Sequence, residues 1–134
     1  MTDSTRRSEH RSNEELASEA KALLADVLSR QAPLAPKQRL AIPEQEMPSQ
    51  DPVARRGNMN EVAVGYTEEQ CRLEAQRCLQ CKNAPCVAGC PVRINIPAFL
   101  AAAAGGDFGK SIAVIKESSL LPAVCGRVCP QEVQ

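Results

Sequence analysis

Apolar residues in the first third of the chain recur at helical spacing. They predict one amphipathic helix from Asn13 to about Arg30, with Asn13 as its N-cap. Its apolar positions are Leu16, Ala20, Leu23, Leu24, Val27 and Leu28. We expect this stripe to pack against its own protein rather than to dock a partner. Residues 1–12 are polar and charged, and they are predicted to be disordered.

The pattern after this helix is broken by prolines. Residues 31–57 hold five of the ten prolines in the chain, namely Pro33, Pro36, Pro43, Pro48 and Pro52. Because proline lacks an amide donor and restricts φ, this stretch is predicted to be an extended connector. Residues 1–46 are therefore interpreted as an N-terminal extension, with one helix followed by a proline-rich linker.

Three further helices are predicted in the second half: from Thr67 to about Leu79, from Pro97 to Gly105-Gly106, and from Asp107 to about Glu117. Thr67 and Gln70 form a capping-box pattern, and proline suits a first helical turn. Glycine is a common helix stop, and aspartate a good N-cap. No alternation typical of strands is present. The fold class is predicted to be mostly α, small and rich in loops. Two cysteine-rich loops are predicted, one over residues 80–96 and one after about Glu117.

Composition narrows the classes of function. Sixteen basic and sixteen acidic residues balance, which leaves no electrostatic reason to expect nucleic acid or an anionic membrane as a partner. The only aromatic residues are Tyr66, Phe99 and Phe108, so the core must rely on aliphatic side chains and on another source of stability. No secretory signal or membrane-spanning run is apparent, and we expect a cytoplasmic protein.

Seven cysteines are the candidates for that additional source of stability. An odd number fits a disulfide framework poorly, and disulfides are rare in a reducing compartment. The first group has the spacing Cys78-x2-Cys81-x4-Cys86-x3-Cys90-Pro91, which lets one loop direct several thiolates toward an iron–sulfur cluster. In related bacterial runs the cysteine before proline binds a second cluster. By that logic Cys78, Cys81 and Cys86 hold one cluster, and Cys90 reaches another.

A second group, Cys125-x3-Cys129-Pro130, repeats the end of the first and suggests that Cys129 is the counterpart of Cys90. On spacing alone Cys125 is also a candidate ligand. Zinc or a pair of buried thiols are the alternatives, although structural zinc sites usually show paired short spacings. Cys71 is interpreted as a small buried side chain on a helix. Three basic residues flank the two groups, as solvated charges or as groups that tune a cluster: Lys82, Arg93 and Arg127.

These motifs resemble the N-terminal iron–sulfur domain of the NADPH-dependent glutamate synthase small chain, which dihydropyrimidine dehydrogenase and related flavin oxidoreductases share. The resemblance covers about residues 47–134. It rests on Gly65-Tyr66-Thr67-Glu68-Glu69-Gln70, Arg77-Cys78-Leu79-Gln80-Cys81, Pro85-Cys86, Gly89-Cys90-Pro91-Val92, Ile94-x-Ile96-Pro97-x-Phe99 and Leu121-Pro122-Ala123-x-Cys125-Gly126-Arg127-Val128-Cys129-Pro130-Gln131-Glu132.

The resemblance implies an α-helical ferredoxin-like domain with two four-iron clusters, which passes electrons between a flavin- and NADPH-binding region and a catalytic partner subunit. It implies Cys78, Cys81 and Cys86 as ligands of one cluster, and Cys90 and Cys129 as ligands of the other. Cys125 is not usually a ligand in that family. The family continues with further cysteines, so the resemblance implies a truncated or split domain that ends at Gln134.

The sequence contains no Gly-x-Gly-x-x-Gly element for a dinucleotide, and no catalytic residue is assigned. FAD and NADPH are therefore expected only in regions outside these residues. Two other hypotheses stay open. One is a zinc-stabilised interaction module without a redox role, and the other is a non-functional fragment.

Overall fold

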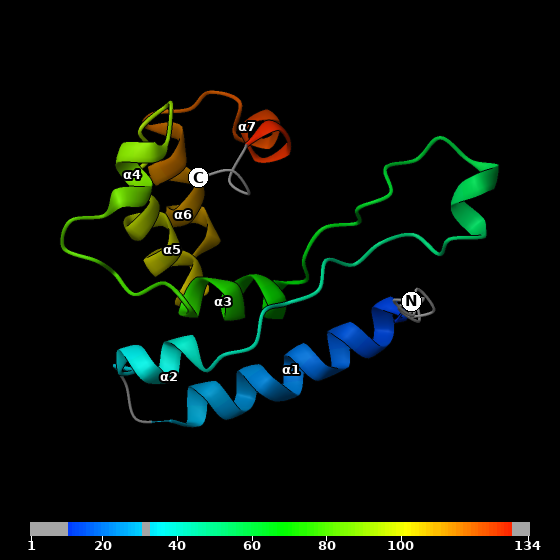
Figure 1. Ribbon diagram of the computed structural model, residues 1–134, viewed down its shortest axis with the longest axis horizontal. Coiled ribbons are helices and arrows are strands. Elements are labelled where there is room, and N and C mark those ends of the chain that lie inside the picture. Colours follow the sequence, from blue (N-terminus) through cyan, green and yellow to red (C-terminus); the bar gives the residue numbers. More distant parts are fainter. Residues whose placement is uncertain (1–10, 31–32, 130–134) are drawn as a thin grey trace, which may run out of the picture.

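The computed structural model describes residues 11–30 and 33–129, and it consists of helices joined by loops (Figure 1). The elements are α1 (Asn13–Ser29), α2 (Pro36–Leu40), a 3-10 helix (Ala54–Gly57), α3 (Glu68–Gln76), α4 (Pro85–Gly89), α5 (Ile96–Ala104), α6 (Phe108–Lys116) and α7 (Pro122–Val128). Within these residues there is no strand, only one isolated bridge between Ser49 and Ala63. The mostly helical class is confirmed, and no described helix has the length and apolar character needed to cross a bilayer.

The first helix lies where it was predicted, but the residue that caps it differs. Ser12, not Asn13, is the N-cap, because its hydroxyl accepts from the Glu15 amide at 3.2 Å while the Glu15 carboxylate accepts from the Ser12 amide at 3.0 Å. The hydrogen bond from the Ser12 amide, and after it the neighbouring Ser12 hydroxyl, lowers the pKa of the Glu15 carboxyl. Asn13 instead accepts from the Ser49 amide at 3.2 Å and ties α1 to the connector. The disorder predicted for residues 1–12 is wrong for Arg11 and Ser12, which make defined contacts, and the rest of that stretch lies outside the described residues.

The prediction of an extended connector over residues 31–57 is wrong in two places. Pro36 opens α2, whose N-terminus is closed by the Gln38 side chain accepting from the Ala35 amide at 2.8 Å. The 3-10 helix Ala54–Gly57 begins beside Asp51, whose carboxylate accepts from the amides of Val53 and Ala54 at 2.9 Å. Proline restricts φ to a value that also suits a first helical turn, so its presence did not exclude these short helices.

The helix starts predicted from capping residues are confirmed in the second half. Thr67 and Gln70 form the expected capping box of α3, and the Asp107 carboxylate accepts from the Lys110 amide at 2.8 Å to open α6. Between α5 and α6, Gly106 has a φ of +84°, a conformation that glycine adopts without strain. The predicted end of α3 near Leu79 is wrong, because the helix ends at Gln76.

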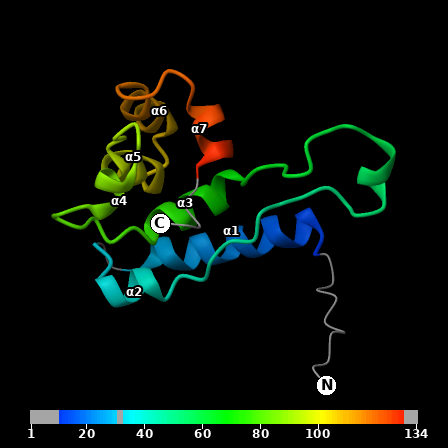
Figure 2. The same ribbon diagram turned by 45° about the horizontal axis from the view of Figure 1, so that its top comes forward.

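α3 lies between α1 on one side and α5 on the other, an arrangement that both views show (Figure 2). Its Leu73, which has no exposed surface, joins a core made with α1 and the segment after it: Ala20, Leu24, Val27, Leu34 and Ile42. Two residues on, Ala75 joins a second core with Ala103 and Ala104, against which Leu100 and Phe108 pack. Small alanines let α3 and α5 approach closely, and one short helix thus unites two cores.

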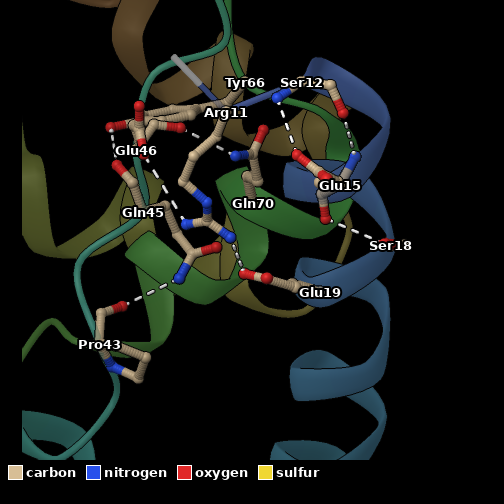
Figure 3. A network of polar contacts seen from close by, with 10 residues as sticks. All are labelled: Arg11, Ser12, Glu15, Ser18, Glu19, Pro43, Gln45, Glu46, Tyr66 and Gln70. Atoms are coloured by element: carbon tan, nitrogen blue, oxygen red, sulfur yellow. Dashed lines mark hydrogen bonds and ion pairs between the residues drawn. The ribbon is translucent and has the colours of Figure 1, made fainter. Parts of the chain in front are cut away.

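A polar network attaches residues 45 and 46, which precede an extended arm at residues 48–64, to α1 and α3 (Figure 3). Arg11 pairs with Glu19 on α1 and reaches the Glu46 carboxylate at 3.7 Å. The buried Gln70 donates to the Glu46 carbonyl at 3.0 Å, and the Tyr66 hydroxyl donates to the Gln45 carbonyl at 3.1 Å. These contacts fix the direction in which the chain leaves the core.

Residues 48–64 form an extended arm that projects away from the helices (Figure 1). Two hydrogen bonds join its two sides. The Gln50 amide donates to the Val62 carbonyl and the Val64 amide donates to the Pro48 carbonyl, each at 2.8 Å. The residues between them are exposed, including Met59.

Candidate metal centre

The first cysteine segment begins where α3 ends. Cys78 follows the C-cap residue Arg77, and its amide still donates to the Ala75 carbonyl at 3.2 Å. Cys78 is therefore held by the last turn of a helix whose core residues are buried. Its thiol is partly exposed.

Gln80, between Cys78 and Cys81, is in the left-handed region with a φ of 53°. Its side-chain amide donates to the Cys78 Sγ at 3.4 Å and to the Pro97 carbonyl at 3.0 Å. The bond to Pro97 joins the loop to the first turn of α5. Within the part of the chain that the structure describes, Gln80 and Arg93 are the only non-glycine residues with positive φ; Gln80 lies inside the first cysteine group and Arg93 three residues after its last cysteine. Such strained residues concentrate at functional sites.

The loop predicted over residues 80–96 contains one short helix. α4 starts with Pro85, places Cys86 in its first turn and ends with Cys90 as its C-cap. Cys81 and Cys86 are exposed, whereas Cys90 is partly buried. A helix of five residues was not visible as a period in the sequence, because it is too short to show one.

The second cysteine segment was predicted as a loop and is also helical. α7 starts with Pro122, contains Cys125 and ends with Cys129 as its C-cap. Cys90 and Cys129 have nearly the same backbone conformation, with φ of −78° and −64° and ψ of 118° and 121°. The residue before a proline is driven toward extended conformations, which accounts for the match. The two segments thus end alike.

Cys125 and Cys71 have surroundings unlike those of the other thiols. The Cys125 Sγ and the hydroxyl of the buried Ser119 are hydrogen-bonded at 3.3 Å. Cys71 lies on α3, where partial burial, followed by the charge of Glu68, raises the pKa of its thiol. A raised pKa disfavours the thiolate that binds metal.

Among the described residues, Arg127 is the one of the three flanking basic residues with a side-chain ion pair. It forms a two-pronged ion pair with Glu61 of the arm, with Nε–Oε1 and Nη2–Oε2 distances of 2.9 and 2.7 Å. The pairing lowers the pKa of Glu61 and raises that of Arg127. Lys82 and Arg93 are exposed. The arm is therefore linked to the helix that carries Cys125.

The donor set fits an iron–sulfur cluster in its chemistry. All seven cysteines are free thiols, and those at 78, 81, 86, 90 and 129 are at least partly accessible. Thiolate sulfur is the usual ligand of such clusters. Among the described residues, no three cysteine, histidine, aspartate or glutamate side chains converge closely enough to hold a metal ion. The structure thus supplies the thiols on two ordered segments without bringing three of them to one point.

Two polar residues near Cys78 were not identified from the sequence. Gln80 could have been noticed by its place inside Cys-x2-Cys. Arg39 donates to the carbonyl of Cys78 across 39 positions of sequence, and no local signal points to it.

Comparisons with known proteins agree with these features. Residues 55–134 match the family model described as dihydropyrimidine dehydrogenase domain II, 4Fe-4S cluster. The chain is 35% identical over 89 residues to the glutamate synthase [NADPH] small chain of Azospirillum brasilense, covering 66% of this chain and 18% of that protein. It is 39% identical over 72 residues to the Escherichia coli protein of the same name, covering 54% and 15%.

A third relative is the NAD-dependent dihydropyrimidine dehydrogenase subunit PreT homolog of Salmonella typhi. The chain is 36% identical to it over 74 residues, which cover 55% of this chain and 18% of that protein. The chain therefore spans less than a fifth of the length of each of these relatives. The family match includes both cysteine segments, α3 and the tip of the arm. The resemblance inferred from the motifs is confirmed, and the chain belongs to the dihydropyrimidine dehydrogenase domain II family of 4Fe-4S cluster domains.

Proposed function

We propose that this chain is an electron-transfer domain of ferredoxin-like arrangement, whose two cysteine segments supply ligands to two four-iron clusters. The observation that supports this most is the pair of ordered segments with free thiols, each ending in a cysteine in the same conformation, in a chain of a 4Fe-4S family. Clusters of this kind accept and return single electrons at potentials set by their surroundings.

The proposed ligands divide between the two clusters. Cys78, Cys81 and Cys86 serve one, and Cys90 and Cys129 serve the other. Cys125 is the weaker candidate, because its thiol is already hydrogen-bonded to Ser119. Since metal binding and folding are coupled, we propose that the exposed Cys81 and Cys86 move toward Cys78 when a cluster binds.

The residues around Cys78 prepare it for this role. Gln80 presents an N–H group to the Cys78 sulfur, and hydrogen bonds to ligand sulfur are among the factors that set cluster potential. The same side chain holds the loop against the start of α5.

The names of the relatives indicate which partners to propose. The relatives are a small chain of a glutamate synthase that uses NADPH and a subunit of an NAD-dependent dehydrogenase. We propose that electrons pass between a flavin- and nicotinamide-binding region and a catalytic partner subunit. The domain division, with residues 1–46 preceding the iron–sulfur domain at 47–134, is part of the same proposal. So is a cytoplasmic location, since free thiols are typical of a reducing compartment.

The test is anaerobic reconstitution of the full chain with iron and sulfide. We expect broad visible absorption that bleaches with dithionite, and iron bound at the site of Cys78, Cys81 and Cys86. Cys78→Ser, Cys81→Ser and Cys86→Ser should each abolish the cluster at that site, because each removes one of its ligands. Cys71→Ala is the matched control and should leave the iron content unchanged. Unchanged iron in all three serine variants would overturn the ligand assignment.

The same experiment separates the alternatives. A zinc-stabilised interaction module would bind zinc in preference to iron and show no visible band. A non-functional fragment would bind neither metal in stoichiometric amounts.

A further inference from the structure

Arg39 connects α2 to the first cysteine segment. Its Nη1 donates to the carbonyls of Gln76 and Cys78, each at 3.0 Å, and its Nε donates to the Leu34 carbonyl at 3.2 Å. Arg39 lies outside residues 55–134, which match the family. A residue of the N-terminal segment therefore contacts the main chain of the first proposed ligand.

These contacts fall at the C-terminal end of α3, where helix carbonyls have no intrahelical donor. Gln76 is the last residue of α3, and the final carbonyls of a helix have no intrahelical donor. A cation is also favoured at a helix C-terminus by the helix dipole. The guanidinium of Arg39 thus satisfies the end of α3 and continues onto Cys78.

Arg39 is itself held in place. Leu34 and Ile42, on either side of α2, are both buried in the core with Leu73 of α3. The Nε bond to Leu34 then fixes the direction of the side chain. The contact joins two rigid elements and does not depend on a mobile loop.

Arg39 carries its charge among main-chain carbonyl oxygens. Within residues 11–30 and 33–129, Arg39 has no ion pair, and its side chain is partly buried. Its printed hydrogen bonds all go to carbonyl oxygens. The guanidinium contacts the main chain of Cys78, and a fixed positive charge near a cluster favours its reduced, more negative state.

We propose that Arg39 is a positioning residue for the first cluster, which fixes the main chain of Cys78 and raises the reduction potential of the cluster that Cys78 binds. This inference rests on the proposed function. It gives α2 a role in holding a cluster ligand, in addition to packing.

The test uses the reconstituted full chain and three variants. Arg39→Gln removes the charge and the hydrogen-bonding fork. Arg39→Lys keeps the charge but loses the Nε bond to Leu34. Lys37→Gln is the matched control, because it removes the same charge from an exposed side chain on the same helix. The measurements are iron content, the rate of iron loss to a chelator, and the midpoint potential by equilibrium titration.

We expect Arg39→Gln to lose iron about tenfold faster than the wild type, in the range found for outer partners of metal ligands, and to have a lower midpoint potential. Arg39→Lys should lose iron faster than the wild type at a potential close to it. Lys37→Gln should match the wild type in both measurements. A purely structural role for Arg39 would change iron retention without changing the potential.

The proposal is overturned if Arg39→Gln and Lys37→Gln have the same potential and the same rate of iron loss. A wild type that binds no cluster would overturn the proposed function and this inference together. If Arg39→Gln does not fold, Arg39→Lys decides: faster iron loss at unchanged helicity supports the proposal, and unchanged loss overturns it.

Discussion

Around α3 the large aliphatic side chains are buried, whereas on and beside α7 residues of the same kinds face outward. Leu73 has no exposed surface, and Leu16 and Leu24 are each 5% exposed. Near the second cysteine group, Leu120, Leu121 and Val128 are 89%, 66% and 70% exposed. Both regions contain large aliphatic residues, but only the region around α3 buries them.

This contrast shows two sources of order in one small chain. The α1–α3–α5 stack is stabilised by apolar burial, which contributes roughly 25 cal/mol per Å² of apolar surface removed from water. The cysteine segments rely on caps, prolines and a few polar bonds, such as those of Gln80 and Ser119. By the proposal above, bound clusters supply what packing does not supply there.

The largest expected effect comes from removing iron. Chelation in the reconstituted chain should bring the amides of α4 and α7 close to the exchange rates of an unfolded chain, because their order depends on the metal. The amides of α1 and α3 should remain protected by their shared core. Amide hydrogen exchange read by mass spectrometry measures both regions in one experiment. Equal protection of α4 and α7 with and without iron would contradict the comparison.

A core substitution should have the next largest effect. Leu73→Ala is expected to lower the free energy of unfolding by about 2–5 kcal/mol, since it leaves a cavity between α1 and α3. The matched control is Leu121→Ala on the exposed side, which should change it by less than about 0.5 kcal/mol. Urea unfolding followed by circular dichroism gives both values. Similar losses in the two variants would show that the apolar residues near α7 are packed after all.

Removing one cap should have a smaller effect. Thr67→Ala deletes the hydroxyl that accepts from the Gln70 amide at the start of α3, which should cost about 1 kcal/mol. Ser118→Ala, at an exposed position after α6, is the control and should be neutral. Thermal unfolding measured for both variants tests the difference. A neutral Thr67→Ala would mean that core packing alone determines where α3 starts.

The smallest effect is expected at the ion pair between the arm and α7. Because Arg127 lowers the pKa of Glu61, the pair stabilises the fold above the unfolded pKa of Glu61, and this contribution is lost as pH falls through the lower folded value. Both side chains are more than half exposed, so the effect should be slight and should weaken in salt.

The variant Glu61→Gln measures this contribution. It should be slightly less stable than the wild type at pH 7 and equal to it in acid below the folded pKa. A stability difference that grows as pH falls would contradict the sign of the shift.

Much of the local structure could be predicted because its causes are local. Thr67 with Gln70, and Asp107 with the Lys110 amide, satisfy helix ends within three residues, so the sequence alone locates those starts. The cysteine spacing likewise identifies the chemistry of the donors. The cap of α1 was misjudged because Ser12 and Asn13 are both good caps, and the choice between them depends on the partner that Asn13 finds at Ser49.

The sequence by itself determined the helical class, the thiol donors and the family resemblance, since periodicity, caps and cysteine spacing are short-range properties of a chain. Only the tertiary structure decided that α3 serves two cores, that Arg127 meets Glu61 and that Arg39 reaches Cys78. These contacts join positions far apart in sequence, and they form because burial of Leu73 and Ala75 brings the helices together. No local pattern encodes such proximity, because it depends on how all the packed surfaces fit at once.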